Sequence, residues 1–389
     1  MDATPTPHSD AELAARLDPA LDRAVSRGGI VGAVVLAARG GRVVYRRAAG
    51  WADREAARPM QPDAIFLLSS VTKPAVALAA MRLAEAGQLP LDEPITRWLP
   101  AFRPRLPGGG EAVITAHQLL LHTAGLASPG SVEHGAPYRA ARVSNGLDGE
   151  FTTLAENLRR IASAPLAARP GERWIYSLCT DVLGAVVEAV TGEPLGRALR
   201  GLVLDPLSMA DSGFAIADPA RRVTHYADGP PGGDGPIVMP ARHPIVFEDG
   251  GTFEFAPGRI DAPGAYPSGG GGMAGSADDV LRLLEAIRTG HPGVVSADGA
   301  ARMRQCQVDA AAQTLGPGWG FGYAGAVLVD PSAGNTPQPA GTVTWGGVYG
   351  HTWFIDPARD LTVLTLTNTA VEGLFGPFPI EVRNAMYAA

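Results

Sequence analysis

Apolar positions near both ends of the chain alternate with polar ones, which is the pattern of half-buried β-strands. Residues 30–53, IVGAVVLAARGGRVVYRRAAGWAD, give two such runs on either side of the tripeptide RGG at 39–41, and this turn signal predicts an antiparallel hairpin. Residues 342–369, TVTWGGVYGHTWFIDPARDLTVLTLTNT, predict two or three more strands, with a turn at the dipeptide DP at 356–357.

A helical period replaces this alternation in six other segments. The first, residues 9–28, begins at the capping residue Ser9 and ends at a glycine, and the last is a short helix over 378–389. The four helices predicted between them cover residues 71–87, 156–164, 179–192 and 276–290.

Glycine- and proline-rich stretches separate these elements. The 49 glycines and 34 prolines cluster at 104–110, 229–240 and 263–275, which predicts long loops of the kind that often line functional sites. We therefore predict an α+β fold, in which both chain ends contribute to one antiparallel sheet and a mostly helical region is inserted between them.

Charge and composition argue against several kinds of partner. The formal net charge is −7 and the arginines form no basic run, so nucleic acid is not an expected partner. The first residues, MDATPTPHSD, are acidic where a signal peptide is basic, and no stretch of about 20 apolar residues follows. We expect a soluble, cytoplasmic protein with no membrane partner.

Cysteine and histidine are not spaced for a metal site or a disulfide framework. Cys179 and Cys306 are expected to be buried free thiols. None of the eight histidines stands in an H-E-x-x-H motif, and His122 and His351 are expected to support loops. We expect neither a metal nor a cofactor.

Lys73 is the only lysine of the chain. Lysine and arginine together number 32, so the other 31 basic residues are arginines. Ser70 precedes Lys73 by three residues at the start of a predicted helix, which places both side chains on one face. A serine needs a neighbouring base to become a nucleophile, and lysine can be that base, whereas arginine stays protonated.

This pair alone leaves two interpretations open. With fifteen serines among 389 residues, a lysine placed at random follows a serine by three positions about one time in twenty-six. The nucleophile motif of another hydrolase class, G-x-S-x-G, is not found at any serine of the chain. The S-x-x-K pair is therefore either a chance arrangement or a nucleophile with its activating base.

Two further patterns are compatible with the same chemistry. Tyr176 stands just before the predicted helix 179–192, and a phenol close to an ammonium group gives up its proton more readily, which would make it a second base. Gly346 and Gly347 let another backbone or a ligand approach a strand closely. Taken singly, such a tyrosine is more often a packing residue, and such glycines can equally mark an ordinary bulge.

In their order and spacing, these motifs resemble the serine β-lactamase and penicillin-binding protein superfamily. They are SVTK at 70–73, LLLHTAGL at 119–126, Tyr176 and WGG at 345–347. Over nearly the whole chain the closest resemblance is to the family VIII carboxylesterases, which look like class C β-lactamases, and especially to Burkholderia-type esterases. The segments that extend it are ADREAARPM, PITRWLPAFRPRL, YSLCTDVLGAVVE, SADDVLRLLEAIR and WGGVYGHTWF.

The resemblance implies the serine β-lactamase fold. One domain, residues 1–58 and 268–389, would hold the antiparallel sheet and its flanking helices, and residues 59–267 would form the mostly helical inserted domain. The active site would lie in the cleft between the two domains.

Carried over by position, the resemblance implies a role for each motif residue. Ser70 is the acylated nucleophile, Lys73 its activator, and Tyr176 the base for acylation and for the deacylating water. Backbone N–H groups of Ser70 and Val348 form the oxyanion hole. The mechanism it implies uses no cofactor.

Two departures from the class C pattern bear on the substrate. Leu178 stands where that pattern has an asparagine, which removes an amide that would hold an amide substrate. Trp345, followed by Gly346 and Gly347, replaces the Lys-Thr-Gly whose cation helps bind a substrate carboxylate. We expect these four residues to contribute to substrate binding, with an uncharged acyl ester favoured over carboxylate-bearing β-lactams and D-Ala-D-Ala peptides.

We therefore expect a serine carboxylesterase that hydrolyses or transfers the short acyl chains of small-molecule esters. An acyltransferase or amide hydrolase on the same fold is the next alternative, followed by a β-lactamase or D,D-peptidase. A non-catalytic penicillin-binding-like sensor belongs to a different class and is disfavoured by the intact Ser70, Lys73 and Tyr176. The sequence leaves the natural ester, the stereochemical preference and the oligomeric state open.

Overall fold

The hairpin predicted near the N-terminus is present in the structure, a computed structural model. The structure describes residues 10–229, 233, 235–247 and 249–388. β1 (Gly32–Arg39) and β2 (Arg42–Asp53) pair antiparallel along their length. Between them, Gly40 and Gly41 take φ values of 57° and 80°, a left-handed conformation that glycine adopts without a steric penalty.

The two ends of the chain meet in one eight-stranded antiparallel sheet with the order β10-β11-β12-β13-β14-β1-β2-β3. β1 pairs with β14 (Leu361–Thr367), so that Ala33 lies opposite Thr367. The remaining strands of the sheet are β3 (Arg58–Pro59), β10 (Trp319–Phe321), β11 (Ala326–Leu328), β12 (Val343–Gly347) and β13 (His351–Asp356). The predicted sheet made from both chain ends is therefore confirmed.

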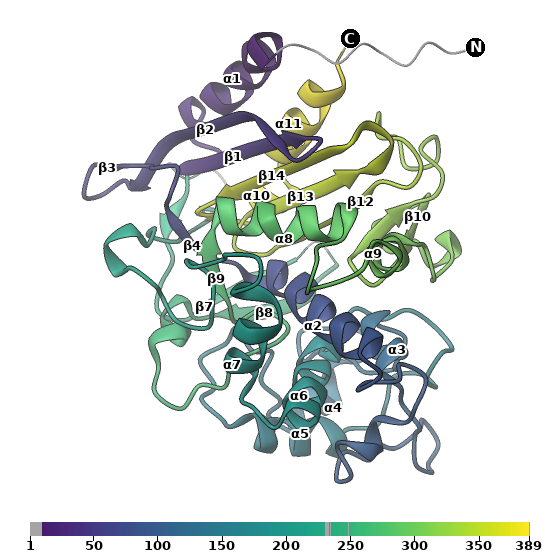
Figure 1. The fold of residues 1–389 in the computed structure, drawn as a ribbon. Helices are drawn as coiled ribbons and strands as arrows, with labels where there is room; N and C mark the ends of the chain where they lie inside the picture. The colour runs from purple at the N-terminus through teal and green to yellow at the C-terminus, as the bar shows by residue number, and fades with distance from the viewer. Residues whose placement is uncertain (1–9, 230–232, 234, 248, 389) are drawn as a thin grey trace.

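Helices cover both faces of the sheet (Figure 1). α1 (Asp10–Ser26) and α11 (Pro377–Tyr387) pack together on one face, where Leu17 and Val382 share a hydrophobic cluster. α8 (Ala277–Thr289) lies on the opposite face against β1 and β14. This burial on both sides explains why the residues of β1 and β14 are almost all buried.

The middle of the chain is mostly helical and lies below the sheet in Figure 1. Its α-helices are α2 (Lys73–Glu85), α3 (Ala116–Leu120), α4 (Gly135–Ala140), α5 (Leu154–Ser163), α6 (Cys179–Thr191) and α7 (Leu195–Leu199). Two short helices that follow later in the chain are α9 (Ala297–Arg304) and α10 (Glu372–Phe375). The division into residues 1–58 with 268–389 and residues 59–267 stays a prediction.

Short elements complete the chain. The small strand pairings join β4 (Ile65–Leu67) to β9 (Ala274–Ser276), β5 (Tyr226–Ala227) to β6 (Ile237–Val238) and β15 (Thr369–Ala370), and β7 (His243–Val246) to β8 (Thr252–Phe255). One π-helical turn covers Arg200–Leu204, and 3-10 turns cover Ser69–Thr72, Ile95–Arg97, Pro219–Arg221, Pro257–Asp261, Ala310–Ala312 and Pro357–Arg359.

The predicted helices form, but some ends and loops differ from the prediction. The helix predicted over 71–87 becomes α-helical only at Lys73, because a 3-10 turn precedes it. The loops predicted over 229–240 and 263–275 are partly wrong, since they contain β6 and β9, strands of two and three residues that are too short to show a period. The predicted cap at Ser9 lies outside the described residues.

Two other expectations can be compared with the structure. Both cysteines are free, and Cys179 is buried as predicted, but Cys306 is partly exposed. Within the described part of the chain, no helix has the length and apolar character needed to cross a membrane.

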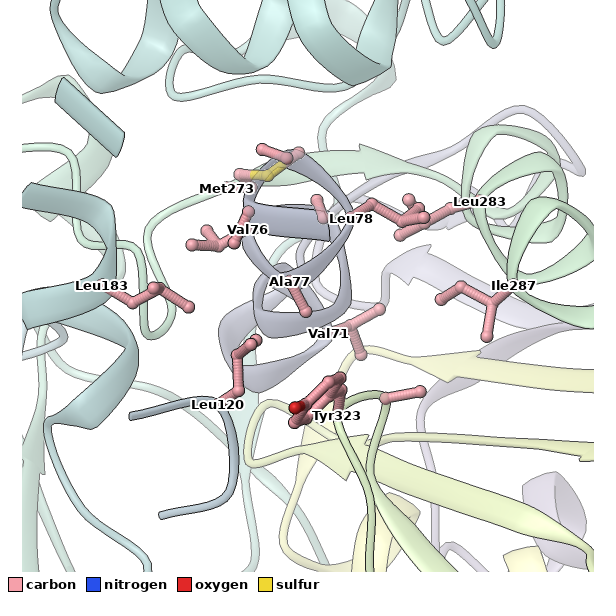
Figure 2. Packing of buried hydrophobic residues seen from close by; sticks show 14 of the residues in the cluster. Val71, Val76, Ala77, Leu78, Leu120, Leu183, Met273, Leu283, Ile287 and Tyr323 are labelled. Atoms are coloured by element: carbon pink, nitrogen blue, oxygen red, sulfur yellow. The ribbon is translucent and has the colours of Figure 1, made fainter. Parts of the chain in front are cut away.

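The largest hydrophobic cluster surrounds α2 (Figure 2). Val76 points toward Leu183 of α6, while Leu78 points toward Leu283 of α8. α2 is therefore packed between the helical region and the layer that covers the sheet. Because the residues that begin α2 also carry the S-x-x-K motif, this packing fixes the position of the motif.

We predict that Leu36→Ala, in the middle of β1, lowers the free energy of unfolding by about 2–5 kcal/mol, because Leu36 has no exposed surface and the sheet cannot close the cavity. The measurement is urea denaturation followed by circular dichroism. Val113→Ala, at a residue that is 61% exposed, is the matched control and should change stability by less than about 0.5 kcal/mol. Equal effects of the two changes would contradict the assignment of β1 to the core.

Candidate active site

Ser70 lies in the 3-10 turn that connects β4 to α2. The turn is anchored from the side, since Met273 N donates to Thr72 Oγ1 at 3.1 Å. Ser69 takes a left-handed φ of 43°, a strained conformation for a residue other than glycine that is often found at functional sites. The turn thus presents Ser70 at the N-terminal end of α2, where backbone N–H groups favour negative charge.

Lys73 begins α2 and directs its ammonium group at Ser70. Its Nζ donates to Ser70 Oγ at 3.1 Å and to the carbonyl oxygen of Gly270 at 2.6 Å. The same nitrogen lies 4.8 Å from the centre of the Tyr176 ring. The structure therefore brings the lysine and serine of the motif into direct contact.

Tyr176 reaches Ser70 from the helical region. Its Oη lies 2.9 Å from Ser70 Oγ, so one serine oxygen has both a lysine and a tyrosine within hydrogen-bond distance. The backbone beside the tyrosine is fixed by His122, which accepts from Ile175 N at its carbonyl oxygen, at 2.9 Å, and from Ser177 N at its Nδ1, at 3.3 Å.

His122 supports this arrangement as a neutral ring. Its Nδ1 accepts a hydrogen bond, and its ring centre lies 4.8 Å from that of Tyr176. Burial and the nearby charge of Lys73 hold the pKa of His122 well below its usual range. His122 therefore adds no second positive charge beside Lys73.

Trp345 makes the third polar contact of the site. Its indole N–H donates to Tyr176 Oη at 3.3 Å, and the two rings lie 5.0 Å apart. Phe321 packs edge-on against the same indole, with 5.3 Å between ring centres. The indole N–H of Trp345, which was expected to contribute to substrate binding, therefore points at Tyr176.

Gly346 and Gly347 are required by close packing on both sides of β12. A Cβ at position 347 would lie 2.4 Å from Ser69 Oγ and 2.6 Å from the carbonyl oxygen of Leu68. A Cβ at position 346 would lie 2.3 Å from the carbonyl oxygen of His351. Only glycine lets β12 approach the turn that holds Ser70 this closely.

A cleft of about 710 Å³ opens at Ser70. Its lining includes Tyr176, Trp345, Gly346 and Val348, so the two residues expected to supply oxyanion N–H groups border the same space. Its other lining residues are largely apolar and include Trp174, Leu315, Trp319, Leu374 and Phe375. Most walls of this cleft therefore suit an uncharged ligand.

Of the four predicted substrate-binding residues, Trp345 and Gly346 line this cleft, whereas Gly347 and Leu178 are not among its lining residues, and Leu178 lies away from it in the core. Leu178 is 4% exposed and belongs to the main hydrophobic cluster. Because it starts α6 with an apolar side chain, that side chain packs inward.

Sequence reasoning missed Gly270 and Asp181. Gly270 accepts a hydrogen bond from Lys73, and Asp181 is a buried acid whose Oδ1 accepts from Ser268 Oγ at 2.7 Å. The available signal was the run SGGGG at 268–272, because four consecutive glycines indicate a backbone packed against other groups. Asp181 carries no such signal, since an acid in the first turn of a helix is common at exposed positions.

Comparison with known proteins places these features in a family. The model of the family described as Beta-lactamase matches residues 14–378. The esterase EstB of Burkholderia gladioli is 54% identical over 380 residues, which cover 97% of this chain and 96% of EstB. The lovastatin esterase of Penicillium rubens is 26% identical over 89% of this chain and 90% of its own length.

A solved structure shows the same architecture over the whole chain. EstCE1, described as a hydrolase with promiscuous acyltransferase activity, superposes with a TM-score of 0.94 and 45% sequence identity. The match covers 97% of this chain and 99% of EstCE1. The fold expected from the sequence resemblance is therefore confirmed.

We predict that Trp345→Phe lowers kcat/KM for a simple ester roughly three- to tenfold, because a hydrogen bond worth about 0.5–1.5 kcal/mol to Tyr176 Oη is lost while the aromatic packing stays. The measurement is initial-rate kinetics with p-nitrophenyl acetate. The matched control is Trp98→Phe, beside a 3-10 turn outside the cleft lining, and it should keep wild-type kinetics. An unchanged kcat/KM in Trp345→Phe would show that the indole N–H has no role.

Proposed function

The chain belongs to the beta-lactamase family, and from this premise we propose that it is a serine carboxylesterase acting through an acyl-enzyme on Ser70. The observation that carries the proposal is the convergence of Lys73 Nζ and Tyr176 Oη on Ser70 Oγ, at 3.1 Å and 2.9 Å. A serine needs an adjacent base to become a nucleophile, and here two groups able to transfer a proton contact its hydroxyl. The esterase activity named for EstB and the hydrolase activity named for EstCE1 support the same function.

Acylation begins with attack of Ser70 Oγ on the ester carbonyl carbon. Tyr176 reacts as a phenolate, because its own proton has passed to Lys73, which thereby becomes an ammonium group beside the ring. The phenolate takes the serine proton and becomes a neutral phenol, and the negative charge moves to the substrate. The carbonyl oxygen becomes an oxyanion, which the N–H groups of Ser70 and Val348 bind. The tetrahedral intermediate then expels the alcohol, which receives its proton from Tyr176.

Deacylation repeats these steps with water as the nucleophile. Tyr176 removes a proton from the water as it attacks the acyl carbon, and the proton returns to Ser70 Oγ as the acyl bond breaks. The N–H of Trp345 stabilises the phenol oxygen whenever it carries negative charge. Apart from the ester and the attacking water, both steps use only groups of the chain itself.

The cleft favours uncharged esters of small molecules. Trp345 stands where the class C pattern has a cation, and its N–H is engaged by Tyr176, so this position offers a substrate carboxylate no charge partner. We propose short-chain acyl esters as substrates, with the aromatic and aliphatic walls in contact with the acyl and alcohol groups.

Acyl transfer to an alcohol is the second candidate function. It is favoured by the description of EstCE1, a hydrolase with promiscuous acyltransferase activity. The same acyl-enzyme serves both reactions, because an alcohol in the cleft can replace water in the second step. The ratio of ester product to acid product with added alcohol separates transfer from hydrolysis.

We predict that Ser70→Ala abolishes hydrolysis of p-nitrophenyl acetate and the formation of an acetyl-enzyme, because the attacking oxygen is removed. The measurements are initial rates and intact-protein mass spectrometry after rapid quenching. Ser163→Ala, which removes an exposed hydroxyl on α5, is the matched control and should behave as wild type. Near wild-type activity in Ser70→Ala would overturn the proposed nucleophile.

We predict that Lys73→Arg lowers kcat about 10²–10⁴-fold while the protein folds, because the positive charge is kept but the group no longer exchanges its proton. The measurement is kcat for p-nitrophenyl acetate, with circular dichroism to verify folding. The reverse exchange on the same helix, Arg82→Lys, is the control and should keep most of the activity. Wild-type activity in Lys73→Arg would show that Lys73 acts only through its charge.

A further inference from the structure

The ammonium group of Lys73 has no carboxylate in direct contact. Among the described residues, no acidic oxygen lies within the 4.0 Å that defines an ion pair, and its hydrogen-bond acceptors are Ser70 Oγ and Gly270 O. The neighbouring His122 ring is neutral, and Tyr176 carries a negative charge only when its phenol has lost its proton. Lys73 is partly buried, and a buried carboxylate that lies close behind its hydrogen-bond acceptor can compensate its charge.

Asp181 is the buried acid on the far side of Gly270. It is 2% exposed, and its Oδ1 accepts from Ser268 Oγ at 2.7 Å. A Cβ at position 270 would lie 2.4 Å from Asp181 Oδ2, so the carboxylate and the Gly270 backbone are in contact. Gly270 therefore lies between the two groups: its backbone packs against the Asp181 carboxylate, and its carbonyl oxygen accepts from Lys73.

The charges that face Asp181 come from several elements. The cations are Lys73 of α2 and Arg259 of the 3-10 turn Pro257–Asp261, and the other titratable groups that face it are Tyr266 of the following loop and Cys179 of α6. Burial raises the pKa of Asp181, and the two cations act in the opposite direction. Arg259 already lies 3.5 Å from another buried acid, Asp148, which leaves Lys73 as the cation that depends on Asp181.

We propose that Asp181 is a positioning residue for the reaction: it is the counter-ion of Lys73 and holds the Gly270 carbonyl against the ammonium group. The proposal rests on the function proposed above. It explains why an acid is buried at this point and why position 270 carries no side chain. It also implies that the negative charge of Asp181 favours the protonated forms of Lys73 and Tyr176.

The test is the pH dependence of kcat/KM for p-nitrophenyl acetate in Asp181→Asn. Asparagine keeps the shape and the acceptor for Ser268 but removes the charge, so Lys73 and Tyr176 release protons more readily. The limbs of the pH profile should move to lower pH by on the order of one unit, and kcat at neutral pH should fall about tenfold. KM should change little, since Asp181 is not among the residues lining the cleft.

Asp148→Asn is the matched control. Asp148 is also buried, accepts from Ser144 Oγ at 2.7 Å and has a pKa raised by burial, but it pairs with Arg259 and not with Lys73. This variant should keep the wild-type pH profile. An unmoved profile in Asp181→Asn, or equal shifts in both variants, would overturn the proposal.

A second variant covers the case in which Asp181→Asn does not fold, as judged by circular dichroism. Ser268→Ala removes the hydroxyl that stabilises the Asp181 anion and should move the profile in the same direction by a smaller amount. An unmoved profile there would also contradict the proposal. Failure of the proposed function looks different, since wild type would then be inactive toward esters or Ser70→Ala would remain active.

Discussion

The active site depends on one close approach, between β12 and the 3-10 turn that carries Ser70. Gly347 packs so tightly against Ser69 and Leu68 that no side chain fits at its position. This contact joins a strand near the C-terminus to the start of α2, and it places Ser70 and Val348 along one cleft. The geometry of the proposed oxyanion hole, with its two backbone N–H groups, would be set by that separation, because a shift of a few tenths of an ångström changes both hydrogen bonds. The eight-stranded sheet is the frame that holds β12 in place.

The single lysine of the chain shows what the site demands from a cation. Elsewhere the chain uses arginine, whose guanidinium forms many surface ion pairs with Asp and Glu. Beside Ser70 the requirement differs, because the group donates to an oxygen, fits against the Tyr176 ring and, in the proposed mechanism, exchanges a proton. The single nitrogen of an ammonium group can meet all of these conditions, whereas the larger, planar guanidinium group cannot. The presence of a lysine at this one position and its contacts with Ser70 and Tyr176 therefore have the same explanation.

Much of the fold and part of the site follow from local pattern. The hairpin at Gly40 and Gly41 and the end of α6 at Gly192 were predictable because each rests on residues adjacent in sequence. The motif residues were predictable from spacing and resemblance. Asp181 and Gly270 were not, because their importance arises only when α6 and the loop 268–272 pack together. The inward direction of Leu178 and the use of the Trp345 N–H were missed for the same reason, since both are decided by tertiary contacts.

The balance of charge in the site supports the proposed preference for neutral substrates. Lys73 is the cation closest to Ser70, its charge is offset by Asp181 behind Gly270, and His122 stays neutral. The resting site thus has little charge to spare for a substrate carboxylate, and Trp345 at the front of the cleft adds none. During attack, however, a negative charge develops on the substrate oxygen, and fixed N–H dipoles bind it without a further ion. Such a site binds the transition state more strongly than the uncharged ester, because the negative charge exists only during the reaction. This difference in binding is what lowers the activation barrier.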